Sequence, residues 1–252
     1  MRVDVVFTPD GAGAAPTGIV IDVIRATSTI CQALASGYSR VFCAAEVEEA
    51  RALRDMLGEG VLGGERKAVR IPGFDLGNSP LEYLEPAGTT LVLSTTNGTR
   101  AVIAAAERCE RVLVASLLNL SAVVGAARAA GQDALVVCAG VQGTLALDDA
   151  YVAGRIVELL AWNRTDAAEA AARADVRPPG RRADRALELL TQLAAMSRCG
   201  PGRPTTGDPR VRSSERDLGS PLPHPDQAGN DVEDALLGAE RDVRLELRSV
   251  LE

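Results

Sequence analysis

Residues Val20–Thr29 have the sequence VIDVIRATST, in which a short apolar run ends at an aspartate and gives way to arginine and hydroxyl residues. An apolar run too short for a helix, followed by polar residues and then a helical period, is typical of a βα unit. Two further stretches follow this plan: residues 91–100 (LVLSTTNGTR) and residues 136–144 (VVCAGVQGT), with Asp148 and Asp149 just beyond. Loops at the carboxyl ends of parallel strands converge on one crevice, so the three stretches predict a single site.

Strand-like and helix-like segments alternate in this way to about residue 160. The candidate strands are Val3–Phe7, Gly18–Asp22, Arg40–Cys43, Thr89–Ser94, Arg111–Ala115 and Ala134–Cys138. The candidate helices are Thr27–Ser36, Val47–Leu57, Thr99–Ala106, Leu120–Ala130 and Leu147–Trp162. Crossover helices between parallel strands cover both faces of a sheet, so we expect a three-layer α/β/α fold with a mostly parallel or mixed sheet.

Two segments depart from this alternation. Residues Gly63–Pro80 are rich in Gly, Pro and charge, and we expect a functional loop there, held by apolar anchors. After Trp162, the segments Ala167–Ala174 and Ala183–Met196 have helical patterns, whereas residues 200–231 carry six of the 13 prolines. We therefore expect an α/β catalytic region over 1–198, an irregular or disordered segment over 199–231 and a C-terminal helix over 232–252.

The composition excludes several classes of function. The net charge of −7 argues against nucleic-acid binding, and no apolar run is long enough for a membrane helix. The five cysteines lack C-x-x-C spacing, which argues against a metal finger or a disulfide framework. The N-terminus does not resemble a signal peptide, so we expect a protein of the reducing cytoplasm. Helices rich in Ala and Leu hint at a homodimer.

The polar clusters at the strand ends suit a phosphate group. Thr27, Ser28 and Thr29 fall where a helix begins, a place where backbone N–H groups bind anions, and Arg25 can clamp the same phosphate. The alternative is an ordinary capped helix with a surface arginine. The second cluster has more polar residues than a turn needs, and it matches neither a Walker loop nor a dinucleotide fingerprint. It predicts phosphate or substrate binding by Thr95, Thr96, Asn97, Gly98 and Thr99.

Carboxylates near these clusters suit Mg²⁺, which proteins hold with one or two carboxylates plus water and substrate oxygens. Asp148 and Asp149 begin a helix, where acids are also favoured by the helix dipole. Neighbours on a helix point about 100° apart, so we expect only one of the two to face the crevice. The full set of candidate metal ligands is Asp22, Glu65, Asp75, Asp148 and Asp149, and Arg66, Asn78 and Ser79 are further candidates for substrate binding.

Together these segments resemble the 2-phosphosulfolactate phosphatase family. The motifs that carry the resemblance are residues 22–29 (DVIRATST), 64–66 (GER), 73–80 (GFDLGNSP), 95–99 (TTNGT), 138–140 (CAG) and 149–154 (DAYVAG). The resemblance implies a family-specific α/β fold and a Mg²⁺-dependent hydrolase of 2-phospho-3-sulfolactate, a step toward coenzyme M. Two departures stand out: Asp148-Asp149 stands where the family commonly has a Glu-Asp pair, and, more seriously, Ser197-Arg198-Cys199-Gly200 leads straight into the Pro-rich run. Our hypothesis is that residues after about Cys199 are a frame-shifted or replaced C-terminus.

The expected reaction is in-line attack of water on a phosphate monoester of a small phosphorylated acid. Asp22, Arg25, Asp148 and Asp149 are the candidate catalytic residues, and Asp22 could alternatively form a phosphoaspartate. One rival is a catalytically impaired phosphoester-binding module with an aberrant tail. The other is a cysteine-dependent amidohydrolase using Cys138, which the chain disfavours because its one histidine, His224, lies in the Pro-rich segment.

Overall fold

The computed structural model describes residues 1–174, and their strands form two sheets. The first has the order β7 (Cys109–Ala115), β2 (Ala15–Ile21), β8 (Ala134–Cys138), β1 (Arg2–Val6) and β9 (Asn163–Arg164). The second has the order β3 (Arg40–Cys43), β6 (Thr90–Ser94), β4 (Val61–Arg66) and β5 (Val69–Arg70). All neighbouring strands are parallel except the antiparallel pair β4 and β5.

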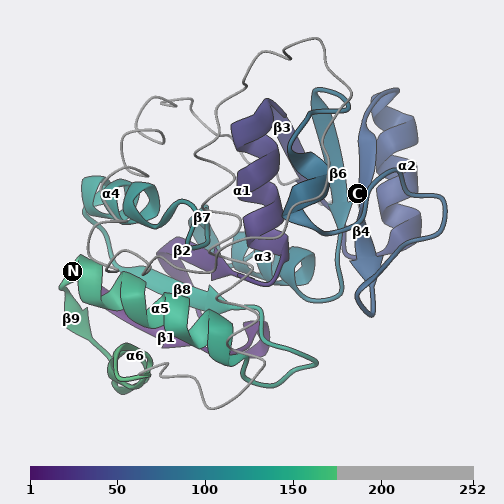
Figure 1. The fold of residues 1–252 in the computed structure, drawn as a ribbon. Coiled ribbons are helices and arrows are strands. Elements are labelled where there is room, and N and C mark those ends of the chain that lie inside the picture. Colours follow the sequence, from purple (N-terminus) through teal and green to yellow (C-terminus); the bar gives the residue numbers. More distant parts are fainter. Residues whose placement is uncertain (175–252) are drawn as a thin grey trace, which may run out of the picture.

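The helices form three layers around the two sheets (Figure 1). α4 (Leu120–Ala130), α5 (Leu147–Leu160) and α6 (Asp166–Ala172) cover the outer face of the five-stranded sheet. α1 (Ala26–Ser36) and α3 (Gly98–Ala106) lie between the sheets, and α2 (Val47–Leu57) covers the outer face of the four-stranded one. Two 3-10 turns, η1 (Pro9–Gly11) and η2 (Pro80–Tyr83), complete the described part.

Alternation along strand β6 shows why the four-stranded sheet is apolar on both faces. Leu91 and Leu93 pack into the central layer with α1 and α3, whereas Val92 packs outward against α2. A parallel strand covered by helices on both faces reads as a continuous apolar run, which is the pattern that predicted these strands. The predicted α/β fold with a mostly parallel arrangement and helices on both sides is confirmed. Its division into two sheets is a finding of the structure.

Most predicted elements begin and end within three residues of the observed ones, including the helix expected over Ala167–Ala174. The prediction of a loop over Gly63–Pro80 was wrong in part, because this segment contains the end of β4 and all of β5. The helix predicted over 183–196, the segments predicted over 199–231 and 232–252, and the hypothesis of a replaced C-terminus all concern residues outside the described range.

Gly63 and Gly64 explain why strand β4 was predicted as a loop. A Cβ on Gly64, which has φ +143°, would lie 1.9 Å from the carbonyl oxygen of Ser94, and one on Gly63 would lie 2.1 Å from the Tyr83 hydroxyl. Both positions therefore require glycine for close packing, although glycine in a sequence usually indicates a turn or a weak strand.

Substituting Ala for Gly64 is expected to destabilise the protein by about 3 kcal/mol, because the methyl group meets backbone and the φ angle is unfavourable for L-residues. Gly58→Ala is the matched control: its φ is +68°, but nothing lies within 4 Å of the added carbon, so we expect a cost of about 1 kcal/mol. Urea unfolding of both variants measures the difference. Equal costs would contradict the close approach of β4 to β6.

Candidate active site

The carboxyl ends of the two sheets meet at Asp22. This residue follows β2 in the five-stranded sheet, and Gly98 begins α3, the helix that follows β6 in the four-stranded sheet. A Cβ added to Gly98 would lie 2.4 Å from Oδ2 of Asp22 and 2.4 Å from Cβ of Ala26 at the start of α1. The first two polar clusters predicted from the sequence are therefore in direct contact, across the junction of two sheets.

The hydroxyl groups that follow Asp22 hold the backbone of the β2–α1 loop. Oγ1 of Thr27 donates to the carbonyl of Asp22 at 2.8 Å and accepts from its N–H at 3.1 Å. Oγ of Ser28 donates to the carbonyl of Val23 at 2.7 Å, and Oγ1 of Thr29 donates to the carbonyl of Asn78 at 3.2 Å. Because each hydroxyl proton is committed to a carbonyl, these residues shape the loop around Asp22.

Asp149 ties this loop to the end of β8. It is buried at the start of α5, where Oδ1 accepts from the N–H of Val23 at 2.9 Å and Oδ2 accepts from the N–H of Gly140 at 3.0 Å. Its neighbour Asp148 is half-buried. The two acids therefore differ: Asp149 is held inside the protein by two backbone N–H groups, whereas Asp148 is more exposed.

Negative charge accumulates among these carboxylates. Burial is the largest cause that raises the pKa of Asp22, to about 7; the charges of Asp148 and Glu65 also raise it, whereas the N–H groups of Ala26 and Arg25 lower it. Burial and the charge of Asp22 raise the pKa of Asp149 to about 8. Burial also raises the pKa of Asp148. None of the ion pairs formed among residues 1–174 involves these carboxylates, so the charge is not balanced by a basic side chain of the described part.

The loop between β6 and α3 is closed by reciprocal hydrogen bonds. The N–H of Thr95 donates to Oγ1 of Thr99, and the N–H of Thr99 donates to Oγ1 of Thr95, each at 3.0 Å. The N–H of Thr96 donates to Oε1 of Glu65 at 2.8 Å. Within residues 1–174, the N–H groups of Asn97 and Gly98 have no partner. These two donors stand at the N-terminus of α3, beside Asp22.

Two of the predicted substrate-binding side chains are unpaired near this point. The half-buried guanidinium of Arg25 makes no hydrogen bond or ion pair in the described part of the chain. Asn78 is only 5% exposed, its backbone carbonyl contacts Thr29 in the first turn of α1, and its Oδ1 has no partner among the described residues. A buried polar atom left without a partner is costly, which is a common sign of a ligand site. Ser79 is half-buried at the start of η2.

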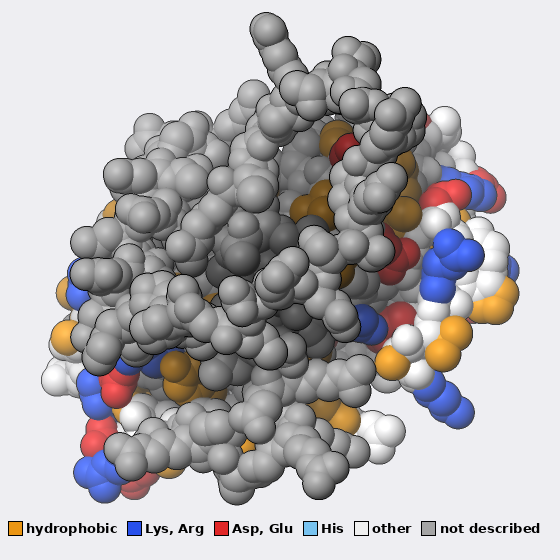
Figure 2. All heavy atoms as spheres, viewed as in Figure 1, with side chains coloured by type: hydrophobic (Ala, Val, Ile, Leu, Met, Phe, Trp, Pro, Cys, Tyr) orange, Lys and Arg blue, Asp and Glu red, His pale blue; other side chains and the backbone are white. Residues whose placement is uncertain are grey.

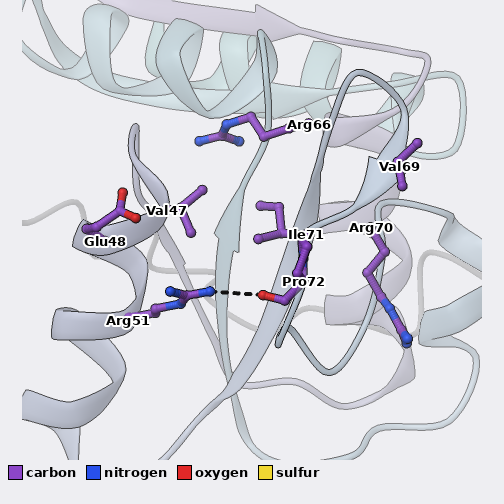
Figure 3. Close-up of a pocket in the computed structure, with 8 residues that line it drawn as sticks. All are labelled: Val47, Glu48, Arg51, Arg66, Val69, Arg70, Ile71 and Pro72. Atoms are coloured by element: carbon purple, nitrogen blue, oxygen red, sulfur yellow. Dashed lines mark hydrogen bonds between the residues drawn. The ribbon is translucent and has the colours of Figure 1, made fainter.

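Arg66 and Asp75 make their hydrogen bonds with other groups and not with the carboxylates around Asp22. Arg66 donates to the carbonyls of Glu65 and Ala45 and to Oγ of Ser94, and its side chain lines a shallow groove of about 350 Å³ between α2 and β5. Figure 3 shows this groove, with Arg51 donating to the carbonyl of Pro72 across it. Oδ2 of Asp75 accepts from the N–H of Leu62 at 2.8 Å and fixes the chain beside β4.

The groove lies on a surface of mixed charge. Figure 2 shows blue and red side chains interspersed at the edge formed by α2 and the β4–β5 hairpin. Two of its arginines hold the segment after β5: Arg51 donates to the carbonyl of Pro72, and Arg70 donates to the carbonyl of Asp75. The groove is therefore a weaker candidate for phosphate than the junction at Asp22.

Cys138 is fully buried at the end of β8, and burial raises the pKa of its thiol far above the usual range. A nucleophilic cysteine needs a lowered pKa, so the structure disfavours the amidohydrolase alternative. Sequence reasoning missed three donors of the site, the backbone N–H groups of Val23, Gly140 and Ala68. Every residue except proline has a backbone N–H group, so no pattern in the sequence marks these three.

Comparison with known proteins shows which family this chain resembles. The family model described as 2-phosphosulpholactate phosphatase matches residues 7–198. The chain belongs to this family. A probable 2-phosphosulfolactate phosphatase of Thermotoga petrophila is 47% identical over 175 residues, which cover 68% of this chain and 74% of that protein. Similarly named proteins of Carboxydothermus hydrogenoformans and Thermus thermophilus are 39% and 42% identical, each over 64% of this chain and 68% of the relative.

The resemblance drawn from the motifs is thus confirmed, and the matched segment ends just before the Pro-rich run. Among residues 1–174, none of the helices combines the length and apolar character needed to cross a bilayer.

Proposed function

We propose that the chain hydrolyses the phosphate monoester of 2-phospho-3-sulfolactate, or of a similar small phosphorylated acid, to the free hydroxy acid and phosphate. Two kinds of support carry the proposal. The family is described as 2-phosphosulpholactate phosphatase and the relatives are named probable 2-phosphosulfolactate phosphatases, which supports this reaction and this substrate. The contact of Gly98 with Asp22 brings free N–H donors and carboxylates to one point, which phosphoryl transfer requires.

The residues at this point fit Mg²⁺, which we propose as the cofactor. Asp149 and Glu65 each use both oxygens to join separate segments of the chain, whereas the N–H groups that face Asp22 and Asp148 belong to their own loop or helix end. Asp22 and Asp148 are therefore the carboxylates that we propose hold the cation. No ready-made group of three or more ligands occurs among residues 1–174, but Mg²⁺ usually takes one or two carboxylates and completes its shell with oxygens of water and substrate. When bound, it would neutralise charge on the phosphoryl oxygens and activate water.

The chain's own groups then bind and orient the phosphate. The N–H groups of Asn97 and Gly98 would donate to its equatorial oxygens, where charge is greatest, and the dipole of α3 adds to the attraction. The free guanidinium of Arg25 would bind a further oxygen. The unpaired Oδ1 of Asn78 is an acceptor, so it would suit water or a cation and not an anionic oxygen of the substrate. A substrate with several anionic groups suits a site with this many donors.

Phosphate release from 2-phosphosulfolactate tests the proposal. The purified protein is assayed with Mg²⁺ and with EDTA, and phospholactate, which lacks the sulfonate, serves as the matched substrate control. We expect Mg²⁺-dependent release and a higher kcat/KM for the sulfonated acid. Folded protein that binds the substrate without releasing phosphate would instead identify the phosphoester-binding module.

Metal binding is expected to depend on pH. Since the folded protein raises the pKa of Asp22 to about 7 and that of Asp149 to about 8, the metal-free protein holds protons that the unfolded chain loses near its ordinary pKa of about 4. The stability contributed by these protons is complete below about pH 4 and is lost as the pH rises through 7 and 8.

Mg²⁺ competes with the same protons, so its effect should grow as they leave. We expect millimolar Mg²⁺ to raise the midpoint of thermal unfolding more at about pH 8 than at about pH 6. The midpoint of thermal unfolding in EDTA, measured in calcium-free buffer at each pH, is the reference from which the shift caused by Mg²⁺ is calculated. A midpoint shift that is the same at both values would contradict binding at Asp22.

A further inference from the structure

Glu65 contacts the site in a way that differs from the other carboxylates. It lies near the end of β4 and is 8% exposed. Its Oε1 accepts from the N–H of Thr96 at 2.8 Å, and its Oε2 accepts from Oγ1 of Thr96 at 3.1 Å and from the N–H of Ala68 at 2.7 Å. One carboxylate thus joins the β4–β5 turn to the loop that leads into α3.

No basic side chain of the described part pairs with this buried charge. Arg66 is its neighbour on β4, but successive side chains of a strand point to opposite faces, and the Arg66 guanidinium lies in the groove beside α2. The charge of Glu65 is therefore compensated by the three hydrogen-bond donors that it holds, two of them on Thr96. Charged acceptors make the stronger hydrogen bonds, so the loop is held firmly.

These contacts determine which backbone N–H groups of the loop between β6 and α3 stay free. Glu65 occupies the N–H of Thr96, and Thr95 and Thr99 satisfy each other. The next two N–H groups, those of Asn97 and Gly98, are left without a partner in residues 1–174 and stand where α3 begins, against Asp22.

We propose that Glu65 is a positioning residue and not a metal ligand: its carboxylate holds Thr96 so that the N–H groups of Asn97 and Gly98 stay directed at the phosphate beside Asp22. The role in catalysis rests on the proposed function, whereas the clamp on the loop does not. Donors fixed before the substrate arrives need no reorganisation during the reaction, which is the main way that oriented N–H groups accelerate phosphoryl transfer.

Two substitutions at Glu65 separate positioning from metal binding. In Glu65→Gln, the amide oxygen accepts from the N–H of Thr96 and the amide nitrogen donates to the Thr96 hydroxyl, which can also accept. This variant keeps the clamp on Thr96 and loses only the charge and the acceptor for Ala68. Glu65→Ala loses all three contacts. A metal ligand would behave differently, since both variants remove the carboxylate.

The first readout is amide hydrogen exchange in the absence of substrate. We expect exchange at Thr96 to accelerate by at least about tenfold in Glu65→Ala and by less than about threefold in Glu65→Gln. The second readout is the steady-state rate: kcat should fall about a hundredfold in Glu65→Ala and less than about fivefold in Glu65→Gln. The third is the Mg²⁺ concentration that gives half the maximal thermal shift, which should stay within about threefold of wild type in both variants.

Glu59→Gln is the control, because Glu59 lies before β4 at the other end of the sheet, where it accepts from Arg40 and Thr90. It should change none of the three readouts. Unchanged exchange at Thr96 in Glu65→Ala would overturn the clamp, and lost exchange protection with retained kcat would overturn the positioning role. If Glu65→Ala does not fold, Glu65→Gln decides alone: a loss of Mg²⁺ affinity of about tenfold or more identifies a metal ligand.

The two proposals fail in different ways. Folded wild-type protein that releases no phosphate would overturn the proposed function. Because the exchange measurement needs no substrate, it reports on the contact between Glu65 and Thr96 whatever the outcome of the assay.

Discussion

Asp22→Asn is expected to lower kcat for phosphate release by about a thousandfold while leaving the protein folded. The amide has the shape of the carboxylate but lacks the charge that attracts a cation, and Asp22 is one of the two carboxylates proposed to hold one. The loop itself should survive, because Thr27 holds the backbone of residue 22 and not its side chain.

The stability of this variant makes the prediction specific. Burial raises the pKa of Asp22, so the charged form is disfavoured in the folded protein, and a neutral amide should leave the unfolding midpoint at about pH 8 equal or higher. Asp55→Asn, on the exposed face of α2, is the control and should leave both kcat and the midpoint unchanged. Retained activity in Asp22→Asn would remove Asp22 from the reaction.

Asp149→Ala is expected to lower the free energy of unfolding by about 3 kcal/mol, because it leaves the N–H groups of Val23 and Gly140 buried without acceptors. Asp149→Asn retains one acceptor oxygen and should cost about half as much. Urea unfolding with Mg²⁺ and with EDTA measures both costs.

Asp148→Ala provides the matched comparison one residue away. Asp148 is half-buried and has no comparable link between loops, so its removal should cost less than about 1 kcal/mol while lowering kcat at least about a hundredfold. A large loss of stability in Asp148→Ala, or full stability in Asp149→Ala, would reverse the roles assigned to this pair.

The sequence predicted local elements well and contacts between distant elements poorly. The apolar runs of β6 and β8 and the helical periods of α2 and α4 are local patterns, so their positions could be predicted to within a few residues. Strand β4 could not, because Gly63 and Gly64 are required by the close approach of Tyr83 and Ser94, which lie far along the chain. The division into two sheets likewise depends on long-range pairing that no local pattern encodes.

In the candidate site, too, local features could be predicted and contacts between distant segments could not. The clusters around Asp22 and Gly98 could be recognised because carboxylate, hydroxyl and glycine residues stand out in a sequence. Their contact across two sheets could not be recognised, nor could the use of Glu65 as a clamp, because its partners are backbone N–H groups and one hydroxyl. Asp148 and Asp149 looked equivalent, and only the position of Val23 and Gly140 distinguishes them.

The most direct test of the site is to map inorganic phosphate, the product of the proposed reaction, by amide chemical shifts in the presence of Mg²⁺. The structure predicts the largest shifts at Asn97 and Gly98, with smaller ones at the start of α1, and their loss in Asp22→Asn. Shifts confined to the groove formed by Arg51, Arg66 and Arg70 would contradict the account, because they would place the phosphate on the outer face of the four-stranded sheet.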